Sequence, residues 1–269
     1  SNTAVGINCM TTQTTANNNT AVGNYALGLN TTGASNSALG NNALYANTTA
    51  SYNTAIGSGA GAATTTGNVN VFIGSNCADA NTTGSGNVAV GQEAFGVNTT
   101  GANNVAIGYN ALKVNTTANN NTAVGQNSLD ANTTGTNNNA FGVESLGANT
   151  TGQSLCAFGS YALDANTTAN DNAAFGHGAL GKCTTGALNN AFGSSCLDAN
   201  TTGGSNTAIG HGALGANTTA SNNVAVGTSA LIDNTTGHSL VAVGSSALAN
   251  NTTASYNVAV GYQAGMTQT

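Results

Sequence analysis

The sequence predicts an all-β chain folded as a parallel β-solenoid (β-roll) of sixteen seventeen-residue coils. Three observations predict this fold: a glycine that returns with a constant period, a short strand-like run before each of these glycines, and columns of similar residues at fixed distances from them. Such periodicity is typical of solenoids, in which each coil contacts only its neighbours. We therefore expect residues 1–269 to form a single uninterrupted repeat domain.

The recurrent glycine defines the repeat, and we number it position 0 of its coil. It stands at Gly6, Gly23, Gly40, Gly57, Gly74, Gly91, Gly108, Gly125, Gly142, Gly159, Gly176, Gly193, Gly210, Gly227, Gly244 and Gly261. No insertion or deletion interrupts this series. Stacked coils explain the strict spacing, because one slip would misalign every later coil.

The residues before the glycine form the expected strand. Position −1 is Val, Ile, Leu or Phe, position −2 is Ala except at Phe72, and position −3 is mostly Thr or Val. Neighbouring side chains of a strand point to opposite faces. We expect the Val and Ile face to line the core, so that Val226→Asp buries a charge, and the Ala and Gly face to meet another chain. The run of four phenylalanines from Phe141 to Phe192 then predicts a ladder of stacked rings inside the core.

A column of asparagines precedes the strands. Position −4 is Asn in fourteen of the sixteen coils, with Leu155 and Leu240 as the exceptions. Such a column predicts a ladder whose side-chain amides form hydrogen bonds from coil to coil. The ladder residues we single out are Asn19, Asn36, Asn53, Asn70, Asn87, Asn104, Asn121 and Asn138.

An Ala-Leu pair at +3 and +4 predicts the opposite wall, and the turn Asn-Thr-Thr-Gly or Asn-Thr-Thr-Ala follows at +7 to +10. Gly and Asn permit tight corners. Because Ala50 and Ala118 replace the glycine at +10, we expect no left-handed backbone at that corner.

Asn-Thr-Thr is also a sequon for N-glycosylation, so two interpretations stay open: turn chemistry, or a glycoprotein with a column of sugars. The candidate glycosylation residues are Asn30, Asn47, Asn81, Asn98, Asn115, Asn132, Asn149, Asn166, Asn200, Asn217, Asn234 and Asn251.

Composition excludes several functions. Only 4% of the residues are charged, and the net charge of −6 includes two lysines and no arginine. Nucleic acid is therefore not an expected partner, because phosphates require clustered basic residues. No apolar run approaches the roughly 18 residues of a membrane span, so we expect no membrane insertion.

Chemistry at a catalytic or metal site is not expected either. The five cysteines have no CxxC spacing, which gives no sign of a metal site. Asp130, Asp164 and Asp198 recur at intervals of two coils, a separation that suits an inverting glycosidase. No aromatic or basic residues are arranged around them, so we expect no enzyme and no cofactor.

The strings Asn-Thr-Ala-Val-Gly, Asn-Val-Ala-Ile-Gly and Asn-Val-Ala-Val-Gly resemble the head repeats of trimeric autotransporter adhesins and similar repeats of phage tail-fibre proteins. This resemblance implies a left-handed β-roll assembled as a homotrimer. Coils of the adhesin heads are usually shorter than the coils of this chain, so the Asn-Thr-Thr turn departs from that pattern. The resemblance also implies an extracellular, cell-surface or virion-surface location and host or cell-surface glycans as partners.

These observations predict a structural role, that of a rigid extracellular fibre or filament segment with adhesive character. Its main partner is itself, as a homotrimer or a head-to-tail filament. One alternative is an ice-binding solenoid, which presents regular Thr and Asn columns to water. Against it, the adjacent threonines at +8 and +9 cannot both face outward. A phage tail-fibre shaft for host recognition is the other alternative.

Overall fold

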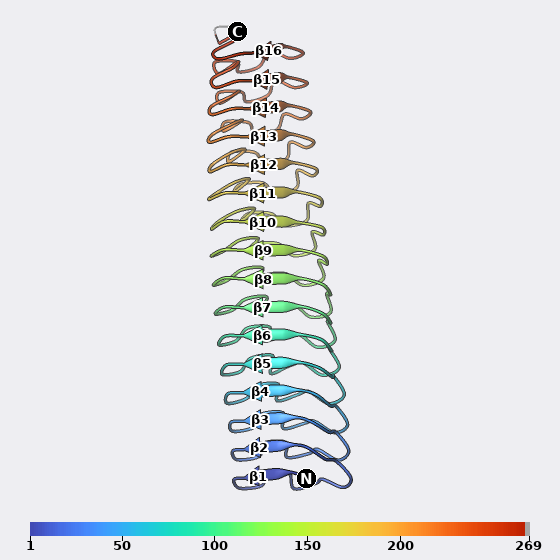
Figure 1. Cartoon of the computed structure of the whole chain (residues 1–269). Helices are drawn as coiled ribbons and strands as arrows, with labels where there is room; N and C mark the ends of the chain where they lie inside the picture. Colours follow the sequence, from blue (N-terminus) through green and yellow to red (C-terminus); the bar gives the residue numbers. More distant parts are fainter. Residues whose placement is uncertain (267–269) are drawn as a thin grey trace. The chain divides into compact units, whose positions relative to one another are not determined.

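The computed structural model describes residues 1–266 and contains one short strand in each repeat (Figure 1). The strands are β1 (Thr3–Val5), β2 (Thr20–Val22), β3 (Ser37–Leu39), β4 (Thr54–Ile56), β5 (Val71–Ile73), β6 (Val88–Val90), β7 (Val105–Ile107), β8 (Thr122–Val124), β9 (Asn139–Phe141), β10 (Cys156–Phe158), β11 (Ala173–Phe175), β12 (Asn190–Phe192), β13 (Thr207–Ile209), β14 (Val224–Val226), β15 (Val241–Val243) and β16 (Val258–Val260). Turns and bends complete each coil, and the described residues contain no helix. The predicted parallel β-solenoid is confirmed, whereas the hand of its coils stays a prediction.

The chain divides into two compact units, residues 1–137 with β1–β8 and residues 138–269 with β9–β16. Within each unit consecutive strands pair in parallel without a register shift. For example, Ala89 of β6 pairs with Ala106 of β7. Each side chain therefore lies beside its counterpart in the next coil, which is the arrangement that a constant period predicts. The single uninterrupted domain stays a prediction.

The core of each coil is filled from two walls. In the second coil, Ala21 at −2 lies opposite the pair Ala26 and Leu27, and all three are fully buried. Val22 at −1 is only half-buried and points outward. Our assignment of the Val and Ile face to the core is therefore wrong. The wall of Ala and Leu leaves a narrow interior, and alanine is the side chain that fits it from the strand.

The one large inward residue of the strands confirms how narrow the interior is. Phe72 at −2 is fully buried. The +4 residues beside it are small, because Gly61 and Ala78 stand where most coils have leucine. A Cβ added to Gly61 would lie 2.7 Å from the ring of Phe72. Close packing thus sets the volume available per coil, and a large residue on one wall requires small ones on the other.

Besides position 0, positions −5, +2 and +4 adopt left-handed backbone, and most of the residues there are not glycine. Leu27 and Leu112 at +4 have φ values of 49° and 52°, a conformation that costs an L-residue about 1–2 kcal/mol. The N–H group of Leu27 donates to the Ala43 carbonyl of the next coil at 3.0 Å. Bonds between coils therefore hold a conformation that an isolated coil would avoid. As expected, no described residue at +10 is left-handed.

Candidate functional site

The predicted asparagine ladder at −4 is present and buried. All eight residues that we singled out are at most 1% exposed. Asn36 Nδ2 donates to the Ala50 carbonyl of its own coil at 2.8 Å, while its Oδ1 accepts the backbone N–H of Asn53 in the next coil at 2.9 Å. Each amide therefore closes its own coil and also binds the following one. The ladder runs mainly from side chain to backbone, with an added amide-to-amide bond from Asn104 to Asn87 at 3.2 Å.

The two leucines in this column interrupt the ladder on one side only. The backbone N–H of Leu155 still donates to Asn138 Oδ1, and that of Leu240 to Asn223 Oδ1, both at 3.0 Å. A leucine side chain has no oxygen to offer the following coil. The coil after each leucine therefore lacks this acceptor.

A second asparagine ladder lies at +7, where the sequence indicated only a turn. Asn98 Nδ2 donates to Asn81 Oδ1 of the preceding coil at 2.7 Å and to the Gly101 carbonyl at 3.2 Å. Here amide joins directly to amide, as we had expected at −4. The +10 carbonyl accepts from both ladders, because Asn87 Nδ2 also donates to Gly101 at 2.9 Å.

The twelve candidate glycosylation asparagines, from Asn30 to Asn251, belong to this second ladder and are all 0% exposed. An N-linked glycan would have to be carried on the Nδ2 nitrogen, which is the ladder donor. A sugar chain on any of them would displace a buried hydrogen bond and open the coil. The geometry therefore supports turn chemistry, and not a sheath of sugars, as the explanation of these sequons.

Thr64 interrupts the +7 ladder, and an asparagine at this position is expected to stabilise the first unit. Thr64 Oγ1 and the adjacent Asn47 Oδ1 are buried without a hydrogen-bond partner. Thr64→Asn supplies the missing donor, so we expect the free energy of unfolding to rise by about 1–2 kcal/mol. Urea denaturation followed by circular dichroism measures the change. The reverse substitution in an intact rung, Asn98→Thr, should lower the stability; equal midpoints for both variants would contradict the ladder.

The threonines at +8 and +9 have different environments. Thr99 at +8 donates its hydroxyl to the Thr116 carbonyl of the next coil at 3.1 Å, and its backbone N–H donates to the same oxygen at 2.9 Å. Thr100 at +9 is exposed. Thr99 is half-buried, so the two threonines of this coil differ in exposure. The +9 position is Thr, and exposed, in each of the fifteen coils that reach it.

The phenylalanines at −1 stack as predicted, but outside the core. Phe141, Phe158, Phe175 and Phe192 form a ladder with ring centroids 4.5–5.0 Å apart and interplanar angles of at most 10°. Phe158 is 37% and Phe192 41% exposed. The ladder therefore lies on the surface that we name the outer strand face, which consists of the residues at −3 and −1 of every strand.

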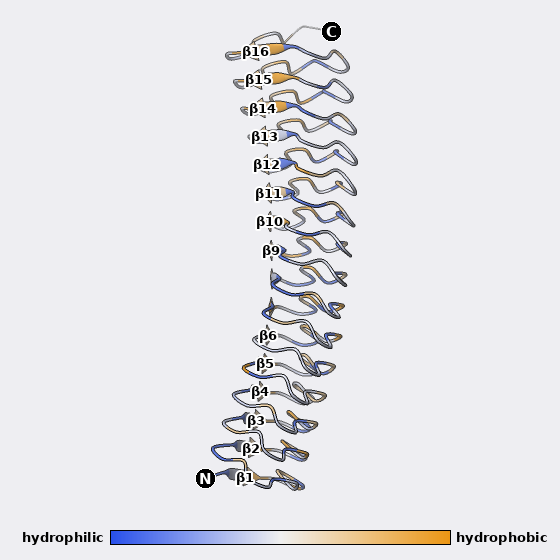
Figure 2. Ribbon diagram, turned by 90° about the vertical axis from the view of Figure 1, so that its right-hand side faces the viewer, coloured by the Kyte–Doolittle hydropathy of each residue, from blue (hydrophilic) through white to orange (hydrophobic). Residues whose placement is uncertain are grey.

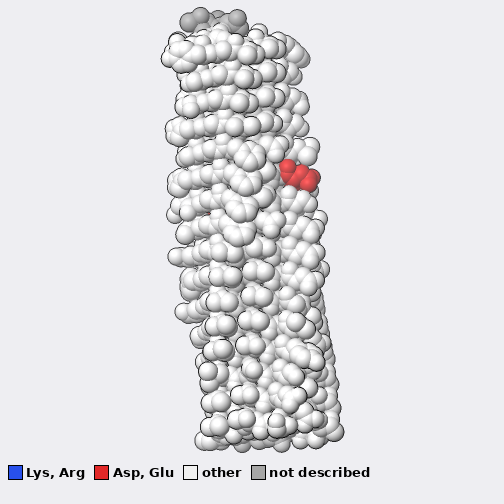
Figure 3. Space-filling view, viewed as in Figure 1, with Lys and Arg blue, Asp and Glu red and all other residues white. Residues whose placement is uncertain are grey.

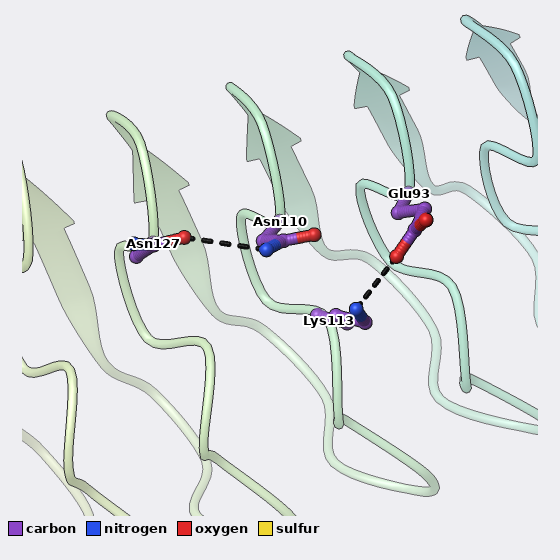
Figure 4. Close-up of polar contacts among 4 residues, drawn as sticks. All are labelled: Glu93, Asn110, Lys113 and Asn127. Carbon is purple, nitrogen blue, oxygen red and sulfur yellow. Dashed lines mark hydrogen bonds and ion pairs between the residues drawn. The ribbon is translucent and has the colours of Figure 1, made fainter.

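Charged groups gather at one place in the first unit. Lys113 Nζ lies 2.6 Å from Glu93 Oε2, and Asn110 donates to Asn127 nearby at 3.4 Å (Figure 4). Glu93, Lys113 and Asp79 border a surface depression of about 330 Å³. The hydrogen bond to Glu93 is the main cause that raises the pKa of Lys113, and burial raises the pKa of Asp79. The pair bridges neighbouring coils.

The other sequence candidates for chemistry lie apart. In the second unit, Asp198 lies 3.6 Å from Lys182 Nζ, and Asp164 is half-buried in an earlier coil. All five cysteines are free thiols. Within residues 1–266, no three His, Cys, Asp or Glu side chains are grouped to hold a metal ion, and no helix has the length and apolar character of a membrane span.

Fold and ladders together define a class, the β-solenoid repeat proteins, in which similar coils bind one another through backbone and asparagine hydrogen bonds. No family model matches the chain, and no curated protein is significantly similar to it.

Proposed function

We propose that the chain is a structural segment of an extracellular fibre or filament on a cell or virion surface. The segment self-associates and gives adhesive assemblies their stiffness. The observation that carries the proposal is that regular columns of polar side chains form hydrogen bonds between successive coils. Both asparagine columns and the +8 threonines bind from coil to coil, so the most regular polar residues support stacking. Resemblance to adhesin head repeats and phage tail-fibre repeats supports the location.

Three of the five thiols are buried in a way that is compatible with an oxidising environment. Burial raises the pKa of Cys77 to about 12, that of Cys183 to about 11 and that of Cys196 to about 12. Only the thiolate reacts readily with oxidants or other thiols. These three cysteines therefore stay protonated at neutral pH, whereas Cys9 and Cys156 are half-buried.

Electron microscopy of the purified protein tests the structural role. We expect straight, elongated particles or filaments of uniform width. Compact, isolated particles at every protein concentration would contradict the proposal. Immunogold labelling of intact source cells or virions then tests the location, and label confined to the cell interior would refute the surface assignment.

A second candidate, ice binding, is favoured by the exposed threonine column at +9. Position +1, which is also exposed in most coils, varies from coil to coil, whereas +9 is always Thr. Parallel coils place these side chains about 4.8 Å apart, a regular array facing water. Thermal hysteresis of the wild type, lost when Thr83, Thr100 and Thr117 are replaced by lysine, would support this function. A wild type without hysteresis would end it.

A further inference from the structure

The outer strand face is uncharged in both units, and its −1 column is apolar. Position −1 carries Val, Ile, Leu or Phe in all sixteen coils, and neither −1 nor −3 carries a charged residue. Figure 2 shows the hydrophobic strands β14–β16 in orange at the edge of their coils. The face turned toward the viewer in Figure 3 has acidic side chains at one place and no visible Lys or Arg. Covering this surface removes apolar area from water without burying a charge.

Residue sizes on this face are correlated within each coil. Phe158 and Phe175 stand beside Cys156 and Ala173 at −3, and the other two phenylalanine coils have Asn there. All six coils with Val at −3 carry only Val or Ile at −1. Phenylalanine at −1 therefore never occurs beside valine at −3, and in two of its four coils the −3 residue is small. Solvent imposes no such constraint, whereas a packed interface does.

The buried core of the same solenoid shows the same kind of size matching between side chains. There the large Phe72 is matched by the small Gly61 and Ala78. Compensation between facing positions is therefore how this chain fills a closed space. On the outer strand face, however, −1 and −3 lie side by side on one strand and do not face each other. Their sizes must be matched through a partner.

We infer that two copies of the chain pair through their outer strand faces, in parallel and level with each other, about a twofold axis along the stacking direction. This inference rests on the proposed self-association and specifies its surface. A twofold rotation about that axis reverses the strand direction of the partner, so position −1 of each coil faces position −3 of the same coil in the other copy. Phe158 then packs on the partner's Cys156, and Phe175 on the partner's Ala173.

Two further considerations support a second copy as the occupant. Side chains that interdigitate with rungs about 4.8 Å apart need a partner of the same spacing, and a second copy has it. Eight strands per unit with an outer width of about 10 Å bury about 1,600 Å² over both units and both copies, the size of a standard stable interface. In a threefold arrangement, −1 would not face −3 of the same coil in another copy, so the side-chain sizes at these two positions would not need to match.

Cross-linking between two different variants tests the geometry. One chain carries C156S and F158C, the other keeps Cys156 and Phe158, and Cys9 is replaced by serine in both. The chains are co-expressed with different tags and mildly oxidised. We expect a mixed covalent dimer, because facing sheets accept an inter-sheet disulfide, and little covalent dimer from either chain alone. Moving the engineered cysteine to Val226, four coils away, should abolish the product. Equal cross-linking at Val226, or none from the F158C mixture, would overturn the pairing.

Light scattering separates this inference from the proposed function. We expect the wild type to be dimeric or larger, F158D/F175D to be monomeric with an unchanged circular dichroism spectrum, and the surface control S160D to behave as the wild type. Wild type and F158D/F175D that associate equally would refute the outer strand face but leave self-association intact. A wild type that is monomeric at all concentrations would refute both.

Discussion

Ala225→Asp is expected to unfold the coils around β14, with a loss of about 4 kcal/mol or more in stability. Ala225 is fully buried and lies between Ala208 and Ala242 of the adjacent strands. A carboxylate at this position would be surrounded by alanine and leucine side chains, without a cation to pair with it. Hydrogen exchange measured coil by coil should show lost protection centred on β14.

The matched control is Thr228→Asp, in the same coil. Thr228 at +1 is exposed, so the added carboxylate stays in water and stability should change by at most about 0.5 kcal/mol. Equal loss of protection in both variants would show that −2 is not the inward position. Val226→Asp is not a suitable test of the core, because Val226 lies on the outer strand face.

Gly108→Ala is expected to destabilise the first unit by about 3 kcal/mol or more. Gly108 has a φ of 135°, and an added Cβ would lie 2.5 Å from the Gly125 carbonyl oxygen of the next coil. The two coils cannot move apart locally to relieve this contact, because the N–H of Gly125 donates to the Ile107 carbonyl at 2.8 Å. The midpoint of urea denaturation measures the effect.

Gly96→Ala serves as the control for Gly108→Ala. Gly96 has no left-handed φ, and the nearest atom to an added Cβ is the Glu93 carbonyl oxygen at 3.3 Å. We expect a change below about 1 kcal/mol. If both alanine variants unfolded at the same urea concentration, position 0 would not require glycine, and the close approach of coils at this position would be wrong.

Period and residue type were sufficient to predict the architecture. Strict recurrence of Gly6 and its fifteen counterparts predicted one coil per repeat, and the column containing Asn36 predicted a ladder between coils. Both are confirmed because they depend only on register. The same reasoning found the stacking of Phe141 to Phe192, since equivalent residues of adjacent coils must lie together.

Orientation could not be predicted in the same way. A strand of alternating small and large apolar residues has two plausible inward faces, and hydrophobicity favoured the wrong one. The coincidence of Phe72 with Gly61 and Ala78 was the signal that −2 faces the +4 wall. The ladder at +7 was missed because Asn in an Asn-Thr-Thr turn usually faces solvent. Left-handed Leu27 contradicts local preference and is stabilised by a hydrogen bond to the next coil.

Fibre diffraction from aligned protein shows directly whether equivalent residues of successive coils lie above one another. We expect a strong reflection at about 4.8 Å along the stacking direction, from parallel strands that repeat once per coil. A pattern without that spacing, or one dominated by the roughly 5.4 Å pitch of α-helices, would contradict the stacked coils.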